Sequence, residues 1–230
     1  MKFLKSFTKF DITLFLCSVF VIVLSFILFD RENYLTLFAS LIGVTSLIFN
    51  AKGNPFGQIL MIIFSIIYGI ISYTFSYYGE MITYLGMTLP MAAFALVSWL
   101  KNPYKNNKSQ VKVNSVSKKE VAFMLILSAV VTAVFYYVLK ITKTANLIPS
   151  TVSVTTSFIA AYLTFRRSPY FALAYAANDV VLIYLWILAT TCNISYLSVI
   201  ICFVIFLIND LYGYVSWQKM KAAQKNKSLA

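Results

Sequence analysis

Two aspartates, Asp179 and Asp210, lie inside long apolar stretches of the sequence, and each directly follows an asparagine, Asn178 or Asn209. A carboxylate at the centre of a bilayer costs about 2.5–3.5 kcal/mol even by the lower estimates, so such residues usually face a cavity or a partner. No Lys or Arg lies within these stretches to pair with them. The two Asn-Asp pairs therefore predict a polar site that binds a solute inside the membrane.

Aromatic residues accompany both pairs at the spacing that places side chains on one face of a helix. Amide and carboxylate groups bind the hydroxyls of a sugar, whereas Tyr and Trp rings attract a cationic ring by about 0.5–2 kcal/mol per contact. A phosphorylated solute would instead need Arg, Lys or helix N-termini. We therefore predict a neutral or cationic, nucleoside-like solute. The residues predicted to bind it are Asn178, Asp179, Asn209, Asp210, Tyr175, Trp186, Tyr212 and Tyr214.

Other roles are open for the two aspartates. They could tie two helices together, although such polar contacts contribute only about 0.6 kcal/mol. They could also relay protons. Intramembrane aspartyl proteases use two aspartates as an acid-base pair. Their aspartates lie in the motifs Tyr-Asp and Gly-x-Gly-Asp, whereas the aspartates here lie in AANDVV and LINDLY. We therefore expect a transporter and no enzyme, with a channel or a purely structural helical protein as further alternatives.

The elements that must position these residues are transmembrane helices. Of the 230 residues, 60% are hydrophobic and 11% charged, whereas an average soluble domain is about one-quarter charged. A spanning helix needs about 20 mostly apolar residues, and such stretches recur along the chain. Because lipid cannot satisfy open backbone groups, we predict an all-α membrane protein. Its eight predicted spans are 12–29, 34–50, 56–78, 81–100, 121–139, 147–165, 170–190 and 194–217.

The basic excess of the chain is a topology signal. The net charge is +12, and the Lys-rich segment 101–120 could suggest a nucleic-acid interface. In an eight-span arrangement, however, 16 of the 19 Lys and Arg fall on one side of the membrane. This asymmetry predicts that both termini are cytoplasmic and that no nucleic acid is bound. The first apolar run lacks a small-residue cleavage site, so we expect it to be retained as a helix.

Two parts of the chain resemble each other. Each contains a basic turn with a proline, Pro55 or Pro169, and each ends in Val-Ser-Trp, at Trp99 or Trp217. A single span, 121–139, separates the two three-helix units. Each span is therefore offset by four from its counterpart, so both units have the same orientation, and parallel repeats typically place the solute between them near mid-membrane. The two tryptophans are expected in the aromatic belt at the cytoplasmic interface. The predicted domains are an accessory N-terminal helix (1–33), a first three-helix repeat (34–100), a basic cytoplasmic loop with a linker helix (101–146), a second three-helix repeat (147–217) and a basic cytoplasmic tail (218–230).

Around these residues the chain resembles the PnuC family of bacterial vitamin transporters, in the form found in Gram-positive bacteria. The resemblance covers about residues 34–220 and rests on YYGEMITYLGMTLP with the closing VSW, on RRSPYFALAYAANDVVLIYLW and on FLINDLYGYVSWQKM. It implies the three-plus-one-plus-three helix arrangement of the SWEET sugar transporters, preceded here by one extra helix. It also implies location in a bacterial cytoplasmic membrane.

The resemblance further implies import of nicotinamide riboside by facilitated diffusion for NAD synthesis, with trapping by a separate cytoplasmic kinase. Nicotinamide riboside has a cationic pyridinium ring and an uncharged ribose, in agreement with the solute predicted from the residues. A better-known branch of the family has two tryptophans where this chain has Ala172 and Tyr175, and Gln or Asn where it has Ala92. Thiamine, which is also a cation with an aromatic ring, or another nucleoside-like vitamin is therefore the alternative solute.

The sequence indicates no cofactor. It has no histidine, and its three cysteines have no ligand spacing, so neither a metal site nor a His-based triad is expected. No Gly-x-x-x-x-Gly-Lys motif for ATP is present, which favours passive carriage. The expected partners are the solute and the lipid bilayer, and a homo-oligomer is left open. Glu80 is expected in a short, solvated outer turn.

Overall fold

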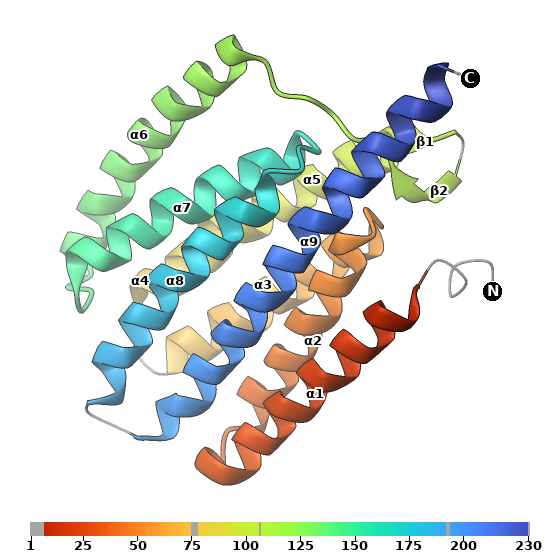
Figure 1. Cartoon of the computed structure of the whole chain (residues 1–230). Helices are drawn as coiled ribbons and strands as arrows, with labels where there is room; N and C mark the ends of the chain where they lie inside the picture. The colour runs from red at the N-terminus through yellow and green to blue at the C-terminus, as the bar shows by residue number, and fades with distance from the viewer. Residues whose placement is uncertain (1–6, 75–77, 106, 192–193, 230) are drawn as a thin grey trace.

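The computed structural model describes residues 7–74, 78–105, 107–191 and 194–229, and within them the chain is a bundle of long helices with one small hairpin (Figure 1). Eight helical segments in this part of the chain are long and apolar enough to cross a membrane, which confirms the predicted number of spans. The elements are α1 (Lys9–Phe29), α2 (Tyr34–Ala51), α3 (Phe56–Thr74), α4 (Tyr78–Thr83), the π-helix η2 (Tyr84–Thr88), α5 (Leu89–Lys101), β1 (Pro103–Tyr104), β2 (Asn107–Val111), α6 (Lys118–Ile141), α7 (Leu147–Phe165), α8 (Phe171–Thr190), the 3₁₀ turn η3 (Ile194–Tyr196) and α9 (Leu197–Leu229).

Two sets of three helices pack in the same order. In the first set α2 packs on α3 and α3 on α5, and in the second α7 packs on α8 and α8 on α9. The first helix of each set also packs on the last helix of the other set, since α2 contacts α9 and α7 contacts α5. The two sets therefore contact each other in the same way, first helix to last helix.

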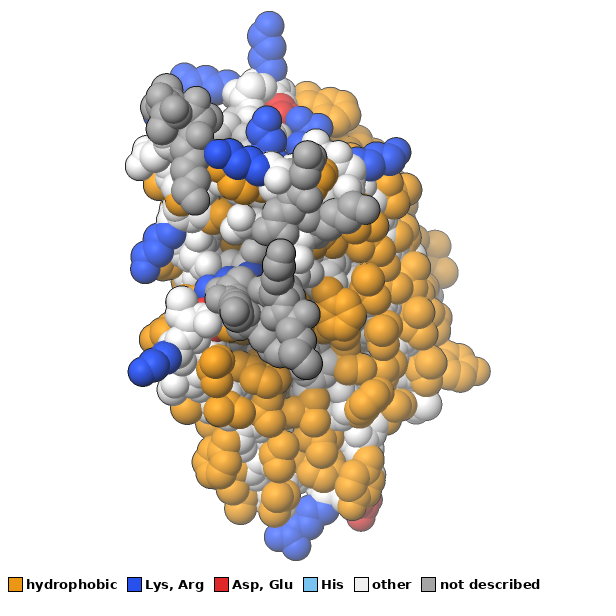
Figure 2. All heavy atoms as spheres, turned by 90° about the vertical axis from the view of Figure 1, so that its right-hand side faces the viewer, with side chains coloured by type: hydrophobic (Ala, Val, Ile, Leu, Met, Phe, Trp, Pro, Cys, Tyr) orange, Lys and Arg blue, Asp and Glu red, His pale blue; other side chains and the backbone are white. Residues whose placement is uncertain are grey.

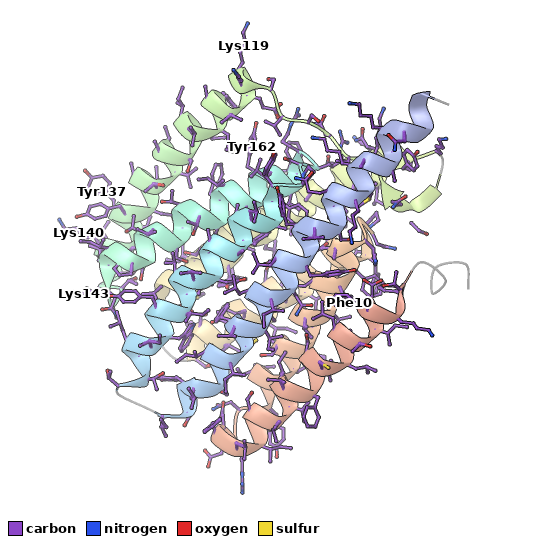
Figure 3. All side chains as sticks on the ribbon, in the orientation of Figure 1. Phe10, Lys119, Tyr137, Lys140, Lys143 and Tyr162 are labelled. Atoms are coloured by element: carbon purple, nitrogen blue, oxygen red, sulfur yellow. The ribbon has the colours of Figure 1, made fainter. Side chains whose placement is uncertain are left out.

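Helix α6 lies on the flank of the bundle, with α7 as its main neighbour (Figure 1). On its outer face Phe123, Ile126 and Tyr137 are 58%, 67% and 64% exposed. The Tyr137 side chain points away from the bundle, and Lys119 and Lys140 mark opposite ends of the helix (Figure 3). Exposing apolar surface to water costs about 25 cal/mol per Å², so this face is suited to lipid.

Basic residues gather at one end of the bundle, which we call the basic end. The start of α1, the hairpin and the last part of α9 lie together there (Figure 1). Lys and Arg side chains gather around this end, whereas hydrophobic side chains cover the flank below it (Figure 2). The opposite end, where α3, α6 and α8 finish, is called the outer end here.

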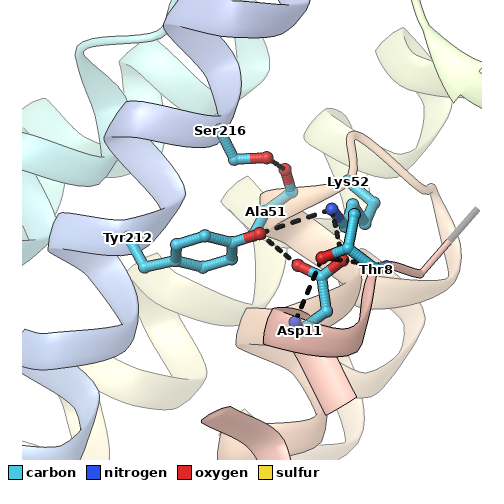
Figure 4. Close-up of polar contacts among 6 residues, drawn as sticks. All are labelled: Thr8, Asp11, Ala51, Lys52, Tyr212 and Ser216. Carbon is cyan, nitrogen blue, oxygen red and sulfur yellow. Dashed lines mark hydrogen bonds and ion pairs between the residues drawn. The ribbon is translucent and has the colours of Figure 1, made fainter. Parts of the chain in front are cut away.

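Helix α1 is fastened to the bundle by a buried carboxylate near the basic end (Figure 4). Asp11 accepts hydrogen bonds from the backbone N–H and the Oγ1 of Thr8, at 2.6 and 2.8 Å, and thereby completes the helix cap. Lys52 Nζ, just after α2, lies 2.6 Å from Asp11 Oδ2, and Tyr212 of α9 donates a hydrogen bond to Oδ1. The first helix, predicted as accessory, is thus tied to both α2 and α9.

A second salt bridge joins α6 to the end of α7, as the Asp11–Lys52 salt bridge joins α1 to the end of α2. Glu120, in the first turn of α6, pairs with Arg166, which follows α7 as Lys52 follows α2. Ser117 caps α6 by accepting a hydrogen bond from the backbone N–H of Glu120. Each of the two three-helix sets is therefore preceded by a helix that carries an acidic anchor at the basic end.

Replacing Lys52 by Met is expected to destabilise the protein by about 3–5 kcal/mol, because Asp11 would stay buried without its ion-pair partner. Thermal unfolding in detergent, followed by circular dichroism, would show the loss as a lower melting temperature. The double variant Asp11→Asn, Lys52→Met removes both charges and is expected to recover most of the loss. Equal melting temperatures for Lys52→Met and the unaltered protein would mean that packing alone holds α1.

Candidate functional site

A cavity lies between the two three-helix sets and extends along the bundle. Its lining includes Glu80 and Thr144 near the outer end, Asp179 at mid-depth, and Asn50 and Phe171 near the basic end. The centres of water-sized spheres can occupy about 80 Å³ of it. Small-molecule sites typically have about 300–1000 Å³, so the cavity is narrow in this conformation.

The two aspartates singled out in the sequence meet in this cavity. Asp179 of α8 and Asp210 of α9 both line it, are 4% and 5% exposed, and interact with each other. Asp179 Oδ2 is buried and has no hydrogen-bond partner among the described residues. None of the residues that line the cavity in the described ranges is Lys or Arg. Two adjacent carboxyl groups without a basic partner favour a cation at this place.

Hydroxyl groups of α7 surround the amide of Asn178, which also lines the cavity. Its Oδ1 accepts hydrogen bonds from Ser153, Thr156 and Ser157, at 3.3, 2.8 and 2.9 Å. Ser153 and Ser157 themselves line the cavity. This wall therefore carries several groups that can exchange hydrogen bonds with the hydroxyls of a sugar.

Aromatic rings form the walls beside the carboxyl groups. Tyr175 of α8 lines the cavity, and its ring centroid lies 6.3 Å from that of Phe171. Across the cavity, Tyr84 of the π-helix packs against Tyr68 and Phe64, with ring centroids 4.4 and 6.0 Å apart. Rings next to carboxylates suit a flat cationic solute, because both the ring faces and the negative charges attract it.

Glu80 lies in a helix and not in the outer turn that was expected, and it is only partly exposed. Glu80 lies in α4 and lines the cavity, and its Oε2 is buried without a hydrogen-bond partner in the described part of the chain. The sequence held one signal for Glu80, since it is the only acidic residue between Asn33 and Lys119.

The π-helix that follows α4 lies just before Pro90, which has no N–H to donate to the carbonyl of Gly86.

Four of the eight predicted contact residues lie outside the cavity lining. Asn209 Nδ2 donates hydrogen bonds to Ser18 Oγ of α1 and to the Ile205 carbonyl. Tyr212 belongs to the anchor of α1. The two remaining residues pack against other rings, Trp186 against Tyr196 at 5.3 Å and Tyr214 against Tyr170 at 6.0 Å.

Two tryptophans pack behind Phe171 at the basic end. Trp99 and Trp217 are 1% and 0% exposed, and their ring centroids lie 5.4 Å apart. Phe171, which lines the cavity, packs against Trp217 at 4.9 Å. The expectation that these tryptophans belong to a lipid-facing aromatic belt is therefore wrong, because both rings lie in the interior.

The first tryptophan and the serine before it hold the end of a helix in the other set. Ser98 Oγ and Trp99 Nε1 each donate a hydrogen bond of 2.8 Å, to the carbonyls of Phe165 and Thr164 at the end of α7. The last carbonyls of a helix have no partner within the helix. Ser98 supplies a donor to the Phe165 carbonyl, and Trp99 supplies one to the Thr164 carbonyl in addition to the N–H of Arg167.

The second tryptophan repeats this contact in the opposite direction. Ser216 Oγ and Trp217 Nε1 each donate a hydrogen bond of 2.7 Å, to the carbonyls of Ala51 and Asn50 at the end of α2. We call these two Ser-Trp pairs, with their acceptors, the latches. Each latch joins one three-helix set to the other at the basic end.

Comparison with known proteins gives a consistent result. Residues 33–219 match the nicotinamide mononucleotide transporter family. Over 198 residues the chain is 24% identical to the nicotinamide riboside transporter PnuC of Neisseria mucosa, and the match covers 84% of this chain and 74% of the relative. The crystal structure of a vitamin B3 transporter PnuC superposes with a TM-score of 0.82 at 24% identity, over 95% of this chain and 94% of that one. At this identity, the structural likeness shows the fold.

Proposed function

Because this chain belongs to the nicotinamide mononucleotide transporter family, and is thus a membrane transporter and not an enzyme, we propose that it carries nicotinamide riboside. The observation that supports this solute is the cavity with Asp179 and Asp210 and without a lining Lys or Arg in the described part of the chain. A mononucleotide would bring its phosphate close to two carboxyl groups, and like charges repel strongly in a site of low dielectric constant. A riboside offers a cationic ring and uncharged hydroxyls instead.

The proposed contacts follow the walls of the cavity. Asp179 and Asp210 attract the cationic ring, Tyr175 stacks on it, and Asn178 with its surrounding hydroxyls binds the ribose. Glu80 adds a third negative group toward the outer end. The other four predicted residues, which lie outside the cavity, are proposed to support it by fixing the packing of α8 and α9. They are Trp186, Asn209, Tyr212 and Tyr214.

Transport is proposed to be passive, with the basic end in the cytoplasm. The sequence has no ATP-binding motif, so the solute would move down its gradient and a separate cytoplasmic kinase would trap it. The clustering of Lys and Arg at the end that carries the start of α1 and the end of α9 supports cytoplasmic termini in a bacterial cytoplasmic membrane (Figure 2).

Calorimetric binding to the purified protein tests the solute. We expect micromolar-range binding of nicotinamide riboside and at least about tenfold weaker binding of nicotinamide mononucleotide, which corresponds to about 1.4 kcal/mol. Saturable uptake into liposomes that contain the protein would distinguish a carrier from a channel. Equal binding of the mononucleotide would contradict the riboside assignment. Binding of thiamine alone would make thiamine, also a cation with an aromatic ring, the solute.

A further inference from the structure

The segment between the hairpin and α6, residues 111–117, is bonded to the first helix of both three-helix sets, and we call it the strap. The backbone N–H of Val111 donates a hydrogen bond of 2.9 Å to the carbonyl of Gly53, just beyond the end of α2. The N–H of Asn114 donates one of 3.0 Å to the carbonyl of Arg167, just beyond the end of α7. The strap therefore bridges the two helix ends that the latches also hold.

The last part of α9 holds the strap from the other side. Gln224 Oε1 accepts a hydrogen bond from the N–H of Val113 at 2.9 Å, and its Nε2 donates one of 3.0 Å to the carbonyl of Val111. Gln224 is 9% exposed and lies beyond residue 217, where the sequence predicted the end of the last span. The extension of α9 thus has a defined contact.

The strap also packs against the two tryptophans of the latches. Val111 is 0% exposed and belongs to one hydrophobic cluster with Trp99, Trp217 and Met220. Gly53 leaves the room for this contact, because a Cβ there would lie 3.1 Å from Met220 Cε and 3.2 Å from Val111 Cγ1. Phe171 of the cavity wall, the two tryptophans and Val111 of the strap thus belong to one packed cluster at the basic end.

We propose that the two latches and the strap together form a closed inner gate, and that the solute leaves when the two three-helix sets separate at the α2–α9 and α5–α7 contacts. This inference rests on the proposed transport function. Every hydrogen bond of the latches joins one set to the other, so these bonds have to break when the sets part. The strap resists the same movement, because it is bonded to the ends of α2 and α7 and to α9 at once.

A pair of engineered disulfides tests this movement. A Cβ at Gly213 of α9 would lie 3.9 Å from the Cβ of Ala51 in α2, and 3.6 Å from the Cβ of Ala172 in α8. Both separations fall in the usual disulfide range of about 3.5–4.5 Å. Gly213→Cys with Ala51→Cys would link the two sets, whereas Gly213→Cys with Ala172→Cys would link two helices of one set. Both variants would be made in a chain whose three native cysteines are replaced by Ala.

We expect oxidation of the Gly213→Cys, Ala51→Cys variant to reduce uptake into liposomes at least about tenfold, and reduction to restore it. Oxidation of the Gly213→Cys, Ala172→Cys variant should leave uptake unchanged. Equal uptake by the oxidised and reduced forms of the first variant, with the cross-link confirmed by mass spectrometry, would overturn the gate. Loss of uptake in both reduced forms, together with absent nicotinamide riboside binding by the unaltered protein, would instead count against the proposed function.

A separate variant tests whether the strap belongs to the gate. Gln224→Ala removes both side-chain bonds that hold the strap to α9. If the strap stabilises the closed gate, this variant should transport several-fold faster with unchanged affinity for nicotinamide riboside. A lower melting temperature without faster transport would assign the strap a structural role and remove it from the gate.

Discussion

Replacing Asp179 by Asn is expected to weaken the binding of nicotinamide riboside at least about tenfold, or by about 1.4 kcal/mol. Asn keeps the shape of the side chain and loses its charge. Because Asp179 is only 4% exposed, water screens its attraction for a cation poorly. Asp210→Asn should have a similar effect, since the two carboxyl groups interact. Calorimetric titration of each purified variant measures the change in affinity.

The reduced form of nicotinamide riboside, whose ring is uncharged, is the matched control ligand. It should bind to Asp179→Asn and to the unaltered protein with equal affinity. Glu80→Gln should weaken binding of the cation by a smaller factor, because Glu80 is partly exposed and its field is screened more. Unchanged affinity in both aspartate variants would mean that the carboxyl groups join α8 to α9 and bind no solute. If the aspartate variants bind nicotinamide riboside with unchanged affinity but their uptake no longer depends on pH, the two aspartates would be assigned to a proton relay.

Trp217→Ala is expected to lower the stability of the protein by about 3–5 kcal/mol. The substitution opens a cavity beside the strap and removes the hydrogen bond from Trp217 to the Asn50 carbonyl, which keeps the backbone N–H of Gly53 as its other donor. Trp99→Ala should have an effect of the same size, because Trp99 makes the same contact with the Thr164 carbonyl. Thermal unfolding in detergent measures both losses.

Tyr137→Ala on the exposed face of α6 is the control for these variants, with an expected change within about 0.5 kcal/mol. A large loss for only one of the two tryptophans would show that the latches differ in strength. A change in uptake with unchanged affinity for nicotinamide riboside would agree with the place of the tryptophans in the gate, whereas weaker binding at unchanged melting temperature would indicate that they contact the solute.

The helices could be predicted from the sequence because a bilayer imposes a fixed length on every apolar stretch. The two aspartates could be assigned to one polar site because both lie inside such stretches, and Asp179 and Asp210 do interact in the cavity. Which side chains of each helix point into the cavity could be predicted only in part. Consecutive residues of a helix point about 100° apart, so Asp210 faces the cavity while Asn209 faces Ser18 of α1. Which of these two residues faces the cavity depends on where α1 packs against α9, and the sequence of α9 alone does not show this.

The basic segment after α5 was predicted as a cytoplasmic loop, and its internal structure was not foreseen. Its many Lys and Asn residues are typical of solvated loops, yet Val111 is fully buried. The alternation of Val111 and Val113 with polar residues was the one signal of an extended segment with a buried side. What makes this segment ordered is its contact with Gly53, Arg167 and Gln224, which are distant in the sequence.

The two latches run in opposite directions between the halves of the chain. Ser98 and Trp99 reach from the first half of the chain into the second, and Ser216 and Trp217 reach from the second half into the first. Such an interface is isologous, in the sense used for twofold symmetric dimers: each half presents the same donor pair and the same acceptor helix end. Neither half can form a latch by itself. Each half of the described chain, α1–α5 and α6–α9, contributes four membrane-length helical segments and one acidic anchor.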